Sequence, residues 1–203
     1  MSNCKDSSAG WRLWLAWMLT STIGVAAVFA LTSAVAMLAG AILGGGAEDE
    51  VPFVPFVGLS FGIMQWLVLR RHIPQAGWWV LASTAGWIAG FGVLAVVFKV
   101  VEGVAPGTIE PKVFAAVFFV AVGIAIGMLQ WLVLRRHAPQ AGWWVLASIV
   151  GWAALGLIVG KSLDKATDLI ALAAVPPAIT GGALVWLLRQ TRPVPSGFGH
   201  SAI

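Results

Sequence analysis

The chain has 203 residues, of which 60% are hydrophobic and only 10% are charged. Soluble domains carry roughly 25% charged residues, so this composition cannot cover a surface that faces water. The high hydrophobicity also excludes a disordered chain, and a single cysteine, Cys4, excludes a disulfide scaffold. With a mean hydropathy of +0.93, the chain is expected to be an integral membrane protein.

Six apolar stretches have the length of a membrane span, which requires about 20 helical residues. They cover residues 11–43, 51–69, 78–101, 113–134, 143–160 and 169–188. We therefore expect an all-α fold, a polytopic bundle of six transmembrane helices. It would form a single transmembrane domain over residues 1–203, with a flexible C-terminal tail at residues 191–203.

The distribution of Lys and Arg predicts the orientation. Six spans place both termini, and the loops after the second and fourth spans, on one side of the bilayer. That side holds eight basic residues against one acidic residue, whereas the opposite side holds four basic and seven acidic residues. Because positive residues favour the cytoplasmic side, both termini are expected there. The basic residues form no separate soluble patch, so no nucleic-acid partner is expected.

Tryptophans mark the same boundary. Indole rings favour the membrane interface, where one edge is wet and the face is apolar. The six that fall near the expected cytoplasmic boundary are Trp11, Trp14, Trp78, Trp79, Trp143 and Trp144. We expect them to lie at that interface.

An internal repeat is the strongest pattern in the chain. Residues 58–87 and 123–152 are identical at 22 of 30 positions. Each copy predicts two helices joined by a short turn, and both copies start from the same side, so they form a parallel repeat of hairpins. The first and sixth spans are weaker candidates for a third copy that would close a six-helix ring. In that alignment Ala9-Gly10-Trp11 matches Ala76-Gly77-Trp78, and Ala178, Gly182, Val185 and Trp186 match Gly58, Gly62, Gln65 and Trp66.

Small residues are expected to bring the helices together, since water does not drive helix association inside lipid. The candidate packing glycines are Gly58, Gly62, Gly123 and Gly127, with Gly86 and Gly151 on the partner helices. They predict packing within one chain, with homo-oligomer contacts as the alternative. Gln65 and Gln130 lie on the same stripes, so each amide needs a partner: a backbone carbonyl, Ser83 or Ser148, or the other glutamine. A contact with a ligand or an ion is the alternative role.

The two turns carry the remaining candidate binding residues. These are Arg70, Arg71 and His72 in one copy and Arg135, Arg136 and His137 in the other. They are either topological anchors or a paired basic site for an anionic lipid headgroup or an acidic partner. A histidine can also ligate haem iron or a chlorophyll-type magnesium, but both histidines lie in polar turns where a pigment ring would be wet. No motif specifies a pigment, haem or metal, so the cofactor stays unknown.

The string QWLVLRRH, followed by AGWWVLAS, resembles a Trp-rich repeat in uncharacterised multi-pass membrane proteins of phototrophic and filamentous bacteria. The resemblance covers the two repeat copies, about a third of the chain, and brings no assigned activity. It implies a bacterial inner membrane, cytoplasmic or photosynthetic. It also implies an accessory subunit of a larger membrane complex.

The expected function is therefore that of a non-catalytic membrane protein, an accessory or scaffold subunit that binds lipid, pigment or a protein partner. No span holds an acidic or basic residue away from its ends, whereas a membrane enzyme or a proton-driven pump needs such groups. The main alternative is a small channel or transporter with a path between the two repeats, near Gln65, Gln130 and Pro176. A membrane enzyme that acts on lipid or quinone is the third hypothesis.

Overall fold

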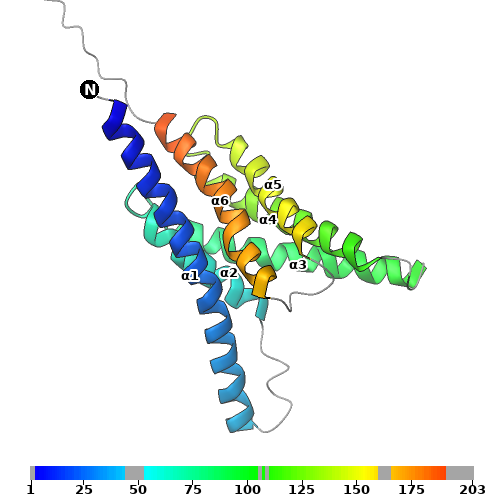
Figure 1. The fold of residues 1–203 in the computed structure, drawn as a ribbon. Coiled ribbons are helices and arrows are strands. Elements are labelled where there is room, and N and C mark those ends of the chain that lie inside the picture. The colour runs from blue at the N-terminus through cyan, green and yellow to red at the C-terminus, as the bar shows by residue number, and fades with distance from the viewer. Residues whose placement is uncertain (1–2, 44–52, 105–106, 108–109, 160–165, 191–203) are drawn as a thin grey trace, which may run out of the picture.

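The computed structural model describes residues 3–43, 53–104, 107, 110–159 and 166–190, and these residues are helical apart from the turns. Six α-helices follow one another, with no strand in this part of the chain (Figure 1). They are α1 (Asn3–Leu43), α2 (Phe53–Leu69), α3 (Trp78–Val104), α4 (Pro111–Leu134), α5 (Gly142–Ile158) and α6 (Ala166–Gln190). The predicted tail at residues 191–203 lies outside the described residues.

Four of these helices are long and apolar enough to cross a membrane. Their apolar segments are Gly10–Ile42, Trp78–Val104, Lys112–Leu134 and Ile170–Gln190. The apolar segments of α2 and α5 are shorter, and at 1.5 Å per residue their 17-residue helices each reach about 25 Å. The helices therefore have the length and composition of a membrane protein.

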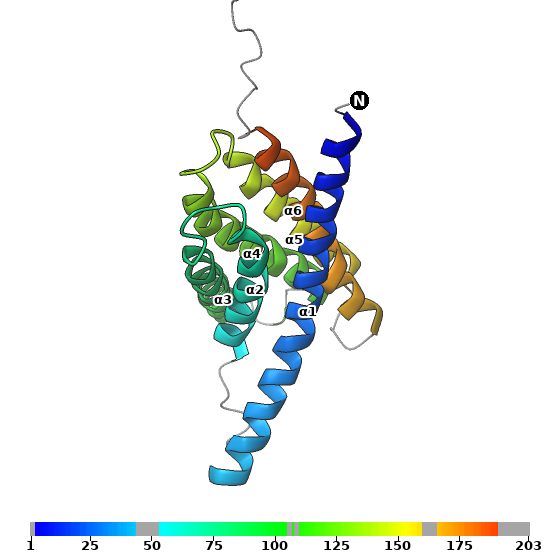
Figure 2. The same ribbon diagram turned by 90° about the vertical axis from the view of Figure 1, so that its left-hand side faces the viewer.

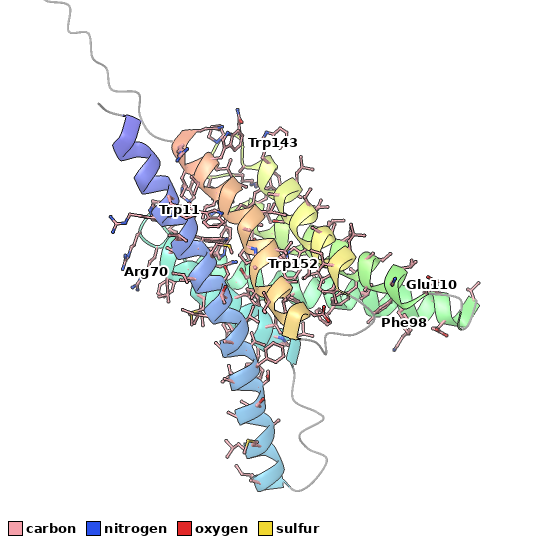
Figure 3. All side chains as sticks on the ribbon, viewed as in Figure 1. Trp11, Arg70, Phe98, Glu110, Trp143 and Trp152 are labelled. Carbon is pink, nitrogen blue, oxygen red and sulfur yellow. The ribbon has the colours of Figure 1, made fainter. Side chains whose placement is uncertain are left out.

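The helices form a closed ring in chain order. Each packs against the next, and α6 returns to pack against α1. Not every helix lies in the ring over its whole length. The second half of α1 extends beyond the other helices in both ribbon views (Figures 1 and 2). Helices α3 and α4 extend together as a hairpin (Figure 1). Phe98 and Glu110 mark the far end of that hairpin (Figure 3).

The two Arg-His turns have nearly the same backbone. In each copy, two successive N–H groups donate to the carbonyl oxygen of the last helical leucine, Leu69 or Leu134, over 2.8 and 2.9 Å. Pro74 and Pro139 follow and prevent the helix from continuing. The copies differ at Gln75, which has a φ of 57° in the left-handed region that disfavours a side chain with a Cβ.

Both turns lie at the same end of the bundle. Their buried residues Ile73, Ala76, Ala138 and Ala141 belong to one apolar cluster. That cluster also contains Leu187 from the last part of α6. The beginning of α1 and the end of α6 lie at this end as well (Figure 1).

Candidate functional site

A layer of polar side chains crosses the centre of the ring. Every helix contributes one, and each is half-buried or buried. They are Ser21, Gln65, Ser83, Gln130, Ser148 and Thr180. One apolar cluster, with Trp17, Trp79 and Trp144, packs on the side of the turns, and a second, with Trp87 and Trp152, packs on the other side. This polar layer is therefore enclosed between two apolar layers.

A step of four residues, which keeps one helix face, builds the three layers. In α3 and α5 the order is Trp, Ser, Trp, at Trp79-Ser83-Trp87 and Trp144-Ser148-Trp152. In α1 it is Trp17, Ser21 and Val25. In α2, α4 and α6 the polar residue lies between two apolar ones, at Phe61-Gln65-Leu69, Ile126-Gln130-Leu134 and Pro176-Thr180-Leu184. The same three layers thus recur around the ring.

Indole N–H groups are the main partners of the polar layer. Trp79 Nε1 donates to Gln65 Oε1 over 2.9 Å, and Trp144 Nε1 donates to Gln130 Oε1 over 3.0 Å. Gln130 Nε2 also donates to Ser83 Oγ over 2.9 Å, which is one of the pairings expected from the sequence. The indole contacts were not expected from the sequence.

In α6 a threonine, Thr180, accepts the indole hydrogen bond that Gln65 accepts in α2 and Gln130 accepts in α4. Trp17 Nε1 donates to Thr180 Oγ1 over 3.2 Å, and the Thr180 hydroxyl donates to the carbonyl oxygen of Pro176 over 2.8 Å. Thr180 therefore takes the place of Gln65 and Gln130. The alignment that put Val185 there is wrong by five residues, because identity cannot show that a threonine hydroxyl replaces a glutamine amide.

The expected position of the first helix needs a similar correction. Trp17, Trp79 and Trp144 contact one another edge to face, with ring centroids 5.3 to 6.0 Å apart. Trp17 is thus the counterpart of Trp79, and Ala16 rather than Trp11 corresponds to Trp78. Since Trp17, Trp79 and Trp144 are at most 1% exposed, they form the core of the ring.

The interface role expected for six tryptophans is wrong for two of them. Trp79 and Trp144 are buried in this triad. Trp11, Trp78 and Trp143 are each more than half exposed, and Trp14 is half-buried with its indole donating to the carbonyl oxygen of Ala178. In the AGWW strings the first tryptophan faces outward and the second inward, since adjacent helical residues point about 100° apart. Trp143 projects from the outer surface at the turn end (Figure 3).

The candidate packing glycines all lie where helices approach closely. A Cβ on Gly58 would lie 2.6 Å from Thr84 Cα, and one on Gly62 would lie 2.9 Å from Val80 Cα. In the second copy, Gly123 faces Trp152 and Gly127 faces Ser148. Gly86 packs on Ile126 of α4, and Gly151 packs on Pro176 of α6. These glycines therefore let α2, α3, α4, α5 and α6 approach one another within this chain.

The two arginines of each turn have different surroundings. The guanidinium carbon of Arg70 lies 5.0 Å from the ring centroid of Trp66, and that of Arg135 lies 5.1 Å from Trp131, so the first arginine makes a cation–π contact. The second arginine, Arg71 or Arg136, lines a groove on the outer face of the ring. Arg70 points away from the helices (Figure 3).

Three grooves with apolar walls lie on the outer face of the ring, each between two neighbouring helices. The α3/α4 groove, of about 310 Å³, has Gln75, Trp78, Arg136 and His137 as its polar and aromatic residues. Its apolar walls are Leu81, Ala82, Ala85, Leu129, Leu132 and Val133. The α1/α2 groove, of about 520 Å³, contains Arg12, Arg71 and His72. The α5/α6 groove, of about 510 Å³, is lined by Trp143, Trp186 and small or apolar residues, with no charged side chain.

The histidines of the turns do not belong to a cluster of potential metal ligands in the described part of the chain. Within the described residues, no three His, Cys, Asp or Glu side chains lie close enough together to hold a metal ion. His72 Nδ1 lies 3.0 Å from the carbonyl oxygen of Val68, one turn earlier, which fixes the ring against its own helix. His72 and His137 are therefore placed as groove residues beside Arg71 and Arg136.

One signal in the sequence could have located the polar layer. Trp-x-x-x-Ser occurs at Trp17, Trp79 and Trp144, once in each of three odd-numbered helices. The occurrences at Trp79 and Trp144 belong to the two repeat copies. The occurrence at Trp17 lies in a span that has little other similarity to the repeat. No known protein family, no curated protein and no solved structure matches this chain.

Proposed function

We propose that the chain is a non-catalytic, multi-pass protein of a bacterial inner membrane that holds anionic phospholipids under its Arg-His turns. All six helices would cross the bilayer, with the two hairpin copies parallel and both termini in the cytoplasm. The lipids would occupy the grooves at α1/α2 and α3/α4. The same face would serve a larger membrane complex as its accessory or scaffold subunit.

The α3/α4 groove carries this proposal. It joins an apolar wall from two helices to a polar end with Arg136, His137 and Gln75. An acyl chain of a lipid fits the apolar wall. A phosphate group fits the polar end, because a guanidinium presents paired donors to phosphate oxygens. Trp78 is 58% exposed beside this end, as an interfacial anchor would be. The position of both turns at one end of the ring supports a common membrane surface for the two grooves.

The short helices are compatible with six crossings. A reach of about 25 Å is less than the hydrocarbon thickness of about 30 Å, and short spans are tolerated through local thinning and flanking anchors. The arginine pairs and exposed tryptophans directly flank α2 and α5 on the turn side. An odd number of crossings between the two turns would instead place them on opposite sides of the membrane, which cysteine labelling of Arg71→Cys and Arg136→Cys in intact cells tests.

The channel alternative receives less support from the ring centre. The tryptophan triad fills the centre on the side of the turns, and Trp87 and Trp152, with centroids 5.2 Å apart, fill it on the other side. A conducting path between the repeats would need both layers to open. A flux assay in liposomes distinguishes the two functions, since the proposed scaffold conducts nothing.

Lipid binding is tested with the protein in mild detergent, by native mass spectrometry after titration with phosphatidylglycerol or phosphatidylcholine of equal chain length. Arg136→Gln should weaken phosphatidylglycerol binding by about fivefold, because one basic residue contributes about 1 kcal/mol near an anionic lipid. Arg135→Gln is the matched control, since it removes the same charge from a side chain that stacks on Trp131. Equal binding of the two lipids, or equal effects of the two variants, would refute the proposal.

A further inference from the structure

A small cavity lies within the polar layer and is separate from the outer grooves. Its volume is about 30 Å³. The polar residues of its lining are Gln65, Ser83, Gln130, Ser148 and Thr180. Trp144 bounds it on the side of the turns, and Trp87 and Trp152 bound it on the other side.

The cavity coincides with a break in the pairing between helices. Gln130 of α4 donates to Ser83 of the preceding helix, α3. The equivalent donor for Ser148 of α5 would come from α6, where Thr180 stands in place of glutamine. Thr180 is shorter, and its hydroxyl already joins Trp17 and the Pro176 carbonyl. Ser148 is 1% exposed, and its buried hydroxyl has no partner among the described residues.

We propose that this cavity is a binding site for one or two water molecules, which hydrogen-bond to Ser148 Oγ and bridge it to the amides and hydroxyls around it. A water needs roughly 10–15 Å³ of such space and two to four polar partners, and the cavity offers both. The Ser83 hydroxyl accepts from Gln130 and keeps a proton to donate. A buried hydroxyl without any partner would be costly between two apolar layers.

Ser21 provides the matched comparison. Its hydroxyl is also fully buried and without a partner in the described part of the chain. Ser21 does not belong to the lining of the cavity. Water bound in the cavity would therefore satisfy Ser148 and leave Ser21 unchanged. This inference is independent of lipid binding, since the α3/α4 groove and the cavity share no lining residue.

The first test observes the water directly in the unaltered protein. Indole N–H signals of ¹⁵N-tryptophan-labelled protein in micelles are recorded in a rotating-frame Overhauser experiment selective for water. Trp144, which lines the cavity, should show a cross-peak to water, and Trp79, equally buried but outside the lining, should show none. No cross-peak at Trp144, or equal cross-peaks at both rings, would overturn the proposal.

The second test compares melting temperatures of conservative variants. Ser148→Ala should lower the melting temperature by about 2–4 °C, the shift expected for one lost bridging contact in a chain of this size. Ser21→Ala should cause no fall. Thr180→Gln should remove the water cross-peak of Trp144, because the added amide fills the space. If Ser148→Ala raises the melting temperature, or matches Ser21→Ala, the cavity is dry and the proposal fails.

Discussion

Replacing Gln130 by leucine removes a polar group that joins α4 to both α3 and α5. Its carbonyl oxygen accepts from Trp144 Nε1, and its amide nitrogen donates to Ser83 Oγ. Gln65 is the natural comparison, because it has the same place in the other repeat copy but makes a single hydrogen bond within the described residues, accepted from Trp79. It is half-buried, whereas Gln130 is 4% exposed.

The expected loss of stability follows from the number of contacts. A hydrogen bond between membrane helices contributes about 0.6 kcal/mol on average and about 1.7 kcal/mol at most. Gln130→Leu removes two such bonds, so we expect a loss of about 1–2 kcal/mol. Gln65→Leu removes one, so we expect a loss of about 0.6 kcal/mol. Membrane insertion should be unaffected in both, since leucine favours the bilayer more than glutamine does.

Reversible unfolding in mixed micelles, followed by far-ultraviolet circular dichroism during titration with dodecyl sulfate, measures both losses. A double-mutant cycle of Gln130→Leu with Ser83→Ala should give a coupling energy of about 0.6 kcal/mol, whereas the cycle of Gln65→Leu with Ser83→Ala should give a value near zero. If Gln130→Leu is no more destabilising than Gln65→Leu, or if the first cycle shows no coupling, the polar layer does not stabilise the ring as its contacts indicate.

Two further predictions concern the backbone and use the same unfolding assay. Gly58→Ala should destabilise the protein by about 1–3 kcal/mol, because its Cβ would lie 2.6 Å from Thr84 Cα and force the helices apart. Gly77→Ala, with open space around the added methyl group, should change stability by less than about 0.5 kcal/mol and serves as the control. Gln75→Gly should stabilise the protein by up to about 1 kcal/mol, because glycine adopts the positive φ of this position without strain. Gln140→Gly is the control and should give no gain in stability. Equal effects of the two substitutions would show that the backbone at Gln75 is not strained.

Much of the fold follows directly from local sequence signals. Helices α2 and α4 end at Leu69 and Leu134, as the Arg pairs and the prolines that follow them predict. Helix α3 begins at Trp78, the expected residue, and α5 begins one residue before the expected Trp143. The glycines at close helix contacts were also predictable, since a small residue every fourth position leaves one face of a helix open for a neighbouring backbone.

The interior of the ring was less predictable because its partners are far apart in the chain. Trp17 and Thr180 are separated by 163 residues, and neither belongs to the identical strings that reveal the repeat. The relation between Thr180 and Gln130 is chemical, since each oxygen accepts from an indole, and an alignment that rewards identity cannot detect it. The inward position of Trp144 was hidden by its neighbour Trp143, because a pair of adjacent tryptophans looks like one interfacial anchor.

Helix α6 differs from α2 and α4 on the outer surface of the ring as well, and this difference predicts the number of bound lipids. Trp186 follows Thr180 by six residues, as Arg71 follows Gln65 and Arg136 follows Gln130. The groove at α5/α6 therefore has an indole where the other two have a guanidinium, and its lining holds no charged side chain. Native mass spectra at increasing phosphatidylglycerol should show two tightly bound lipids per chain, and Trp186→Arg should add a third because it restores the phosphate-binding group. Three lipids on the unaltered chain, or no third lipid on the variant, would show that the arginine of each groove does not determine where anionic lipids bind.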